Sequence, residues 1–95
     1  GMGLFEPRTL KNLRAELLAA HAACAASPSL PSDHQARIAT TAPREVAAAA
    51  AAAAAAGQGD SARTMLTEKL NSPPKASPTG ITWKQIVQAG LDQLR

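Results

Sequence analysis

Apolar residues recur at intervals of three and four in several segments of the 95-residue chain, which is the spacing of one face of an α-helix. In the first segment, this face consists of Leu10, Leu13, Leu17, Ala20 and Cys24. The pattern predicts a helix over residues 7–26. It should end before Pro28, because the residue that precedes a proline avoids the helical region.

The centre of the chain holds ten consecutive alanines, residues 47–56. Alanine has the highest helix propensity, Pro43 suits a first helical turn, and Gly57 suits the left-handed residue that ends a helix. These signals predict a helix over 43–56. Because no face of it carries a large side chain beyond its first turn, we expect other helices to surround it and to approach it closely.

A helix over 61–71 should follow, capped by Asp60 or Ser61. Its buried face consists of Ala62, Met65, Leu66 and Leu70. Together with the alanine helix it forms a helical hairpin at the centre of the predicted fold.

A short connector precedes this hairpin. Ser32 and Gln35 match a capping box, in which the serine caps the first turn and the glutamine reaches back to it. We therefore expect a short helix over 33–41, which ends at a break before Pro43.

The C-terminal segment is separated from the hairpin by residues 71–80, whose three prolines predict an extended linker. A second capping box, from Thr82 to Gln85, then begins an amphipathic helix over 81–95, in which Gly90 suits the close approach of a neighbour. The apolar face of this helix consists of Trp83, Ile86, Val87, Leu91 and Leu94. It must dock on the hairpin of its own chain or of a second copy, and we expect these five residues to be contacts with a partner or within an oligomer.

The composition indicates a thin core. Alanine accounts for 23 residues, whereas Leu, Ile, Val and Phe together account for 16. A thin core in a small domain favours oligomerisation as a source of further burial. We expect one all-α domain over residues 1–95, a bundle of four main helices plus the short connector. Residues 1–6 should form a tail, in which Gly1 before Met2 is typical of a cleaved expression tag.

Candidate chemical sites are sparse. Residues 57–62 match the glycine pattern of a dinucleotide-binding loop, but such a loop follows a strand and this one follows a predicted helix. His21 and Cys24 lie one turn apart and could share a metal with His34, yet zinc takes four ligands and the chain has no further His or Cys. We expect no catalytic residue, cofactor or metal, and expect His21 and Cys24 to pack beside alanines.

Three cations near the start of the first helix are candidates for phosphate contact: Arg8, Lys11 and Arg14. The net charge of the chain is only +3, and with one Trp, one Phe and no Tyr it has few rings on which bases could stack. Nucleic-acid binding through this flank is the alternative function, and a solvated basic flank is the favoured interpretation.

The eleven apolar residues 46–56 fall short of the roughly 20 that are needed to cross a bilayer. One cysteine and the lack of a secretory leader indicate the cytoplasm. The leading prediction is a small non-catalytic helical module for protein–protein interaction, which associates with itself or with another helical protein and not with a membrane.

Overall fold

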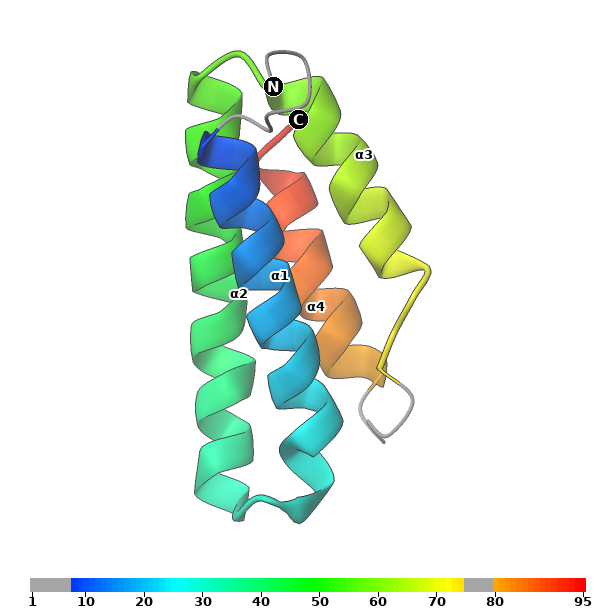
Figure 1. The fold of residues 1–95 in the computed structure, drawn as a ribbon. Coiled ribbons are helices and arrows are strands. Elements are labelled where there is room, and N and C mark those ends of the chain that lie inside the picture. The colour runs from blue at the N-terminus through cyan, green and yellow to red at the C-terminus, as the bar shows by residue number, and fades with distance from the viewer. Residues whose placement is uncertain (1–7, 75–79) are drawn as a thin grey trace.

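The described part of the protein consists of four α-helices and one short 3₁₀-helix (Figure 1). The computed structural model describes residues 8–74 and 80–95, with side chains from residue 83 onward in the second range. The elements are α1 (Arg8–Ala26), η2 (Ser27–Ser29), α2 (Ser32–Ala55), α3 (Gly59–Leu70) and α4 (Gly80–Asp92). These residues contain no strand, so the all-α expectation is confirmed. The predicted tail, and residues 75–79 of the predicted linker, lie outside the described residues, and Gly80 at the end of that linker belongs to α4.

α1 and α2 form a long antiparallel hairpin, and α4 lies behind α1, between α2 and α3 (Figure 1). The leucine face of α1, the apolar face of α4 and residues of α2 and α3 meet in one core. Its largest fully buried side chains are Trp83, Leu13, Leu17, Leu66, Ile86, Val46, Val87 and Cys24.

The alanine run of α2 is not surrounded, contrary to the expectation from sequence. Ala50 and Ala53 are buried, whereas several alanines of the run remain exposed: Ala48, Ala52, Ala55 and Ala56. The other three helices all pack on one side of α2, because α1 and α3 are joined to its ends by short turns and α4 fills the space between them (Figure 1).

α2 is one helix where the sequence predicted two. The expected connector over 33–41 and the alanine helix are continuous, with Pro43 inside α2. A proline in a helix interior leaves a carbonyl without its N–H donor, at a cost of about 3 kcal/mol. Ile38 and Ala42, on the N-terminal side of Pro43, pack against the core and offset this cost. The prediction of a separate connector helix is therefore wrong.

Two predicted caps are also wrong. No side chain caps the start of α2, and Gln35 instead donates from Nε2 to the carbonyl oxygens of Ser27 (2.7 Å) and Leu30 (3.0 Å). α3 begins at Gly59 without a side-chain cap, so Asp60 and Ser61 lie inside its first turn. The capping box that begins at Thr82 depends on a side chain outside the described set.

The turn between α2 and α3 is closed by backbone hydrogen bonds. Gly57 has a φ of +80°, as expected of the left-handed residue that ends a helix. Its N–H donates to the Ala54 carbonyl (3.0 Å), and the N–H of Gln58 donates to the Ala53 carbonyl (2.8 Å). This pair of bonds is a Schellman motif, so Gly57 ends α2 as the sequence indicated.

α4 is attached to α3 near both of its ends. Trp83 donates from Nε1 to the carbonyl oxygen of Lys69 (2.7 Å), and the guanidinium of Arg63 donates to the carbonyl oxygen of Leu94 (2.6 Å). Between these two bonds α4 approaches its neighbours closely, because a β-carbon built on Gly90 would lie 3.0 Å from a methyl carbon of both Leu66 and Val46. The expected close approach at Gly90 is confirmed.

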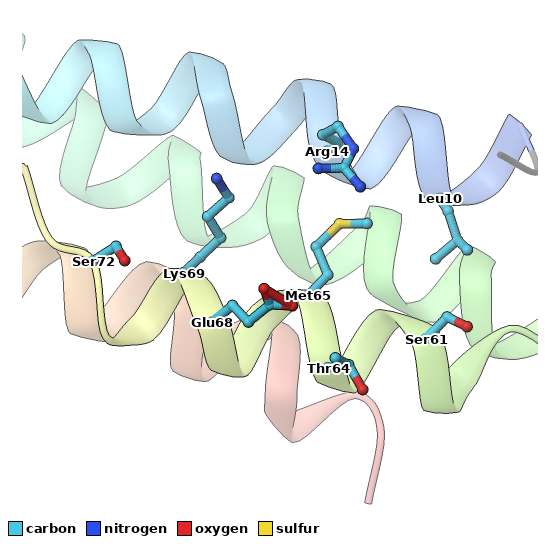
Figure 2. A pocket seen from close by; sticks show the side chains of 8 residues that line it. All are labelled: Leu10, Arg14, Ser61, Thr64, Met65, Glu68, Lys69 and Ser72. Atoms are coloured by element: carbon cyan, nitrogen blue, oxygen red, sulfur yellow. The ribbon is translucent and has the colours of Figure 1, made fainter. Parts of the chain in front are cut away.

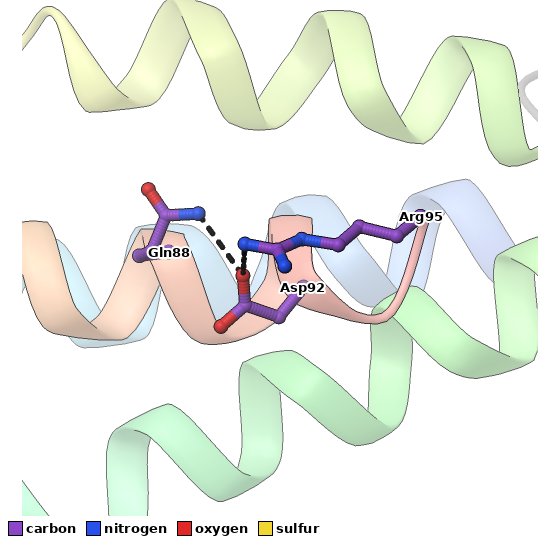
Figure 3. A network of polar contacts seen from close by, with 3 residues as sticks. All are labelled: Gln88, Asp92 and Arg95. Carbon is purple, nitrogen blue, oxygen red and sulfur yellow. Dashed lines mark hydrogen bonds and ion pairs between the residues drawn. The ribbon is translucent and has the colours of Figure 1, made fainter.

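A small polar network covers the exposed end of α4 (Figure 3). Asp92 accepts a hydrogen bond from Gln88 (3.1 Å) and forms an ion pair with Arg95 (3.1 Å). α4 ends at Asp92 and not at residue 95, and a final turn carries the chain to Arg95.

Candidate functional site

The predicted partner face of α4 lies inside the chain. Trp83, Ile86 and Val87 are almost fully buried, Leu94 is buried and Leu91 is partly buried. The rings of His21 and Trp83 pack edge to face, with their centroids 5.1 Å apart and their planes at 90°. Of the two arrangements that the sequence left open, the structure has α4 docked on its own chain. These residues could contact a second copy only if α4 were exchanged between copies.

The three predicted phosphate contacts, Arg8, Lys11 and Arg14, are exposed but do not converge. Their side chains point in different directions around α1. Arg14 follows Arg8 by six residues, which separates their directions by about 120°. Arg14 lines a cavity between α1 and α3.

This cavity has a volume of about 480 Å³. It is lined by Leu10 and Arg14 of α1 and by Ser61, Thr64, Met65, Glu68, Lys69 and Ser72 of α3 and the residues after it. Figure 2 shows Arg14 extending from α1, and Lys69 from α3, into the space between the two helices. Lys69 was not predicted from the sequence, because the pairing of α1 with α3 is a tertiary contact without a local signal.

A groove runs along the other flank of α1, where it meets α2. One cavity in the groove, of about 330 Å³, is lined mainly by small and apolar residues, among them Ala19, Ala20, Ala23 and Ile38, and also by Arg37. A second, of about 400 Å³, is lined by Asn12, Ala15, Glu16, Glu45, Ala48, Ala49 and Ala52. Glu16 and Glu45 line both cavities, so a pair of carboxylates lies at the middle of the groove.

The pKa of Glu16 is raised, first by partial burial and then by the negative charge of Glu45 and a hydrogen bond with it. Among the described residues, neither carboxylate has a cation within ion-pair distance. This pair was missed from the sequence, because the two residues are far apart along the chain and come together only when α1 packs on α2.

Between the groove and the cavity that it shares with α3, α1 presents an exposed surface, three residues of which also line the groove. Its outer face, as we call it, consists of Asn12, Ala15, Ala19 and Ala22, all of which are exposed. Beside it lies Leu18, which is 55% exposed and is the only exposed large hydrophobic residue in the described chain.

His21 and Cys24 do not come together with His34. His21 places Nε2 3.2 Å from the carbonyl oxygen of Ser72, and Cys24 is buried in the core, where burial raises the pKa of its thiol. His34 is exposed on α2. The described residues contain no cluster of three His, Cys, Asp or Glu side chains that could hold a metal ion.

Comparisons with known proteins add no assignment to these sites: no family model, curated protein or solved structure matches the chain. In the described ranges, no helix combines the length and the hydropathy that a membrane crossing requires.

Proposed function

We propose that this protein is a small non-catalytic helical interaction module that associates with itself. The proposal is carried by the exposed Leu18 of α1, together with the open groove between α1 and α2 that is lined by alanines and Ile38. Small residues let a neighbouring helix approach closely, and an exposed leucine supplies apolar area that association would remove from water. One cysteine fits a reducing compartment, and we place this association in the cytoplasm.

The thin core supports the same proposal. Most residues of the alanine run make little or no contribution to the buried core, and four of its alanines are exposed. Association that covers the groove would add apolar burial to a chain that has little of its own, which is a common source of stability for small domains.

Sedimentation equilibrium over a wide concentration range tests the proposal. We expect the apparent mass to rise with concentration from the monomer value of 9.7 kDa toward twice that value. A mass that stays at the monomer value up to millimolar concentration would contradict it.

A second candidate function is the binding of a phosphate-bearing partner, such as a nucleic acid, in the cavity between α1 and α3. It is favoured by one observation, that Arg14 and Lys69 reach into this cavity from two different helices. Glu68 lines the same cavity and reduces its net positive charge.

Retardation of DNA in a gel at low salt tests this second candidate, since phosphate contacts weaken steeply as salt is added. Lys69→Ala should reduce binding, whereas Arg95→Ala, at the exposed C-terminal end, should leave it unchanged. If wild-type protein does not retard DNA at low salt, nucleic-acid binding is excluded.

A further inference from the structure

We infer that the self-association proposed above, on which this inference rests, occurs through the outer face of α1, which packs in parallel against α1 of a second copy around a two-fold axis. Three features of α1 lead to this arrangement: the spacing of its exposed small residues, the position of its charges, and the position of Leu18 relative to the groove.

The outer face has the spacing of a coiled-coil seam. Asn12, Ala15, Ala19 and Ala22 follow one another at intervals of three, four and three, which matches the alternating a and d positions of a heptad. All four are exposed, so none of them is used within the core of the chain. Asn12 occupies an a position, where a single asparagine specifies the register and the number of strands.

The charges beside this seam are complementary between copies. In a parallel pair, the residue at position g of one helix meets the residue at position e of the next heptad in the other helix. Lys11 is at g and Glu16 is at e, so Lys11 of each copy meets Glu16 of the other. Within one chain Glu16 lies beside Glu45 and has no cation at ion-pair distance among the described residues. The second copy supplies the cation that the acidic pair lacks.

Leu18 follows the same pairing of g positions with e positions. It occupies the next g position, and the e position that it meets in the second copy is Ala23. Ala23 lines the cavity of about 330 Å³ between α1 and α2, together with Ala19 and Ala20. The cavity is larger than a leucine side chain, and five of its nine lining residues are alanine or isoleucine, the others being Glu16, Arg37, Thr41 and Glu45. The parallel arrangement therefore moves the exposed Leu18 of each copy from water into the groove of the other.

An antiparallel pair lacks this complementarity. In an antiparallel pair, g positions meet g positions and e positions meet e positions. Lys11 and Leu18 would then lie on the same flank. Glu16 would face the e positions of the second copy, none of which is a cation. Arg8 continues the seam by one turn toward the N-terminus. Its long side chain can extend into water, so the packed part of the seam begins at Asn12.

A charge exchange tests the inference by sedimentation equilibrium. Lys11→Glu and Glu16→Lys should each raise the dimer dissociation constant by about tenfold, because two attractive pairs become repulsive. The double variant should return it to near the wild-type value, since the exchanged charges again attract each other between copies. Positions 11 and 16 face different sides of α1 and cannot pair within one chain. Lys84→Glu, on the exposed side of α4, is the matched control and should have no effect.

Cross-linking tests the parallel register. In a Cys24→Ser background, Ala15→Cys should form a disulfide between copies on mild oxidation, because equivalent d positions meet at a parallel seam. Gln88→Cys on α4 should not. Circular dichroism of the dilute monomer checks that each variant is folded.

The outcomes separate this inference from the proposed function. A chain that stays monomeric contradicts both. A dimer that forms without the disulfide at position 15, or whose dissociation constant is unchanged by Lys11→Glu and Glu16→Lys, contradicts the parallel α1 interface and leaves self-association standing.

Discussion

The indole nitrogen of Trp83 donates its hydrogen to the backbone carbonyl of Lys69, 2.7 Å away, and Trp83 is 1% exposed. The bond joins the start of α4 to the end of α3. Trp83→Phe keeps an aromatic ring but removes the N–H donor, so the Lys69 carbonyl loses this hydrogen bond. We expect the free energy of unfolding to fall by about 2–3 kcal/mol. Urea denaturation followed by circular dichroism measures this change, and Leu18→Ala, at an exposed position, should change the value by less than about 0.5 kcal/mol in the monomer.

Gly90→Ala should destabilise the protein although alanine is the better helix former. A β-carbon at this position would lie 3.0 Å from methyl carbons of Val46 and Leu66. Overpacking of this kind costs about 1–3 kcal/mol, which outweighs a gain in helix propensity of about 1 kcal/mol. Thermal unfolding provides the measurement.

Gly59→Ala is the control for Gly90. It is also helical, but its β-carbon would meet no atom closer than 3.9 Å, so this substitution should be neutral or stabilising. The double variant Val46→Ala with Gly90→Ala should lose less stability than the two single changes predict together, because it removes one of the two clashing groups. Equal melting temperatures for Gly90→Ala and wild type would show that α4 does not approach its neighbours this closely.

Pro43→Ala should stabilise α2. The substitution restores an N–H that can donate to the carbonyl four residues earlier, and it relieves the contact of the proline ring with that carbonyl. We expect the free energy of unfolding to rise by about 1–3 kcal/mol, as measured by urea denaturation. Pro28→Ala, at the start of η2 where no helical bond is interrupted, should give no such gain. A loss of stability in Pro43→Ala would contradict a continuous α2.

Glu16→Gln should stabilise the monomer at neutral pH. The pKa of Glu16 in the folded chain is raised above its ordinary value of 4.5, so the ionised carboxylate disfavours folding. The penalty is absent below the unfolded pKa and complete above the folded pKa. Glu16→Gln should therefore raise the free energy of unfolding at neutral pH. The increase should stay under about 1 kcal/mol because the group is partly exposed. It should disappear as the pH falls through the range in which carboxylates are protonated.

Unfolding measured against pH, at concentrations too low for association, checks this prediction. Glu45→Gln should give a gain of the same sign, since removal of either charge ends the repulsion. A gain from Glu16→Gln that persists unchanged into acid would mean that charge is not its cause.

The parts of the fold that could be predicted are those with local signals. The leucines of α1 repeat at helical spacing, and the structure begins and ends this helix within about one residue of the expectation over the described part. Gly57 ends α2 because only a residue that tolerates positive φ can occupy that position without strain. The break expected at Pro43 is absent, because the packing of Ile38 and Ala42 on the core outweighs the local tendency of a proline to end a helix.

The candidate sites depended on contacts between helices and were harder to find. Glu16 and Glu45 meet only because α1 packs on α2, and Arg14 and Lys69 share a cavity only because α3 lies beside α1. The face of α4 around Trp83 had a clear helical pattern, but periodicity alone does not tell whether such a face is covered by the same chain or by another.

The two hydrogen bonds that hold α4 to α3 have a consequence for the dynamics of the chain. Because Trp83 is bonded to Lys69 near one end of α4, and Arg63 to Leu94 near the other, neither helix can leave the core without breaking a bond to its neighbour. α3 and α4 should therefore open as one cooperative unit, and their slowest amide hydrogens should exchange with solvent at a common free energy.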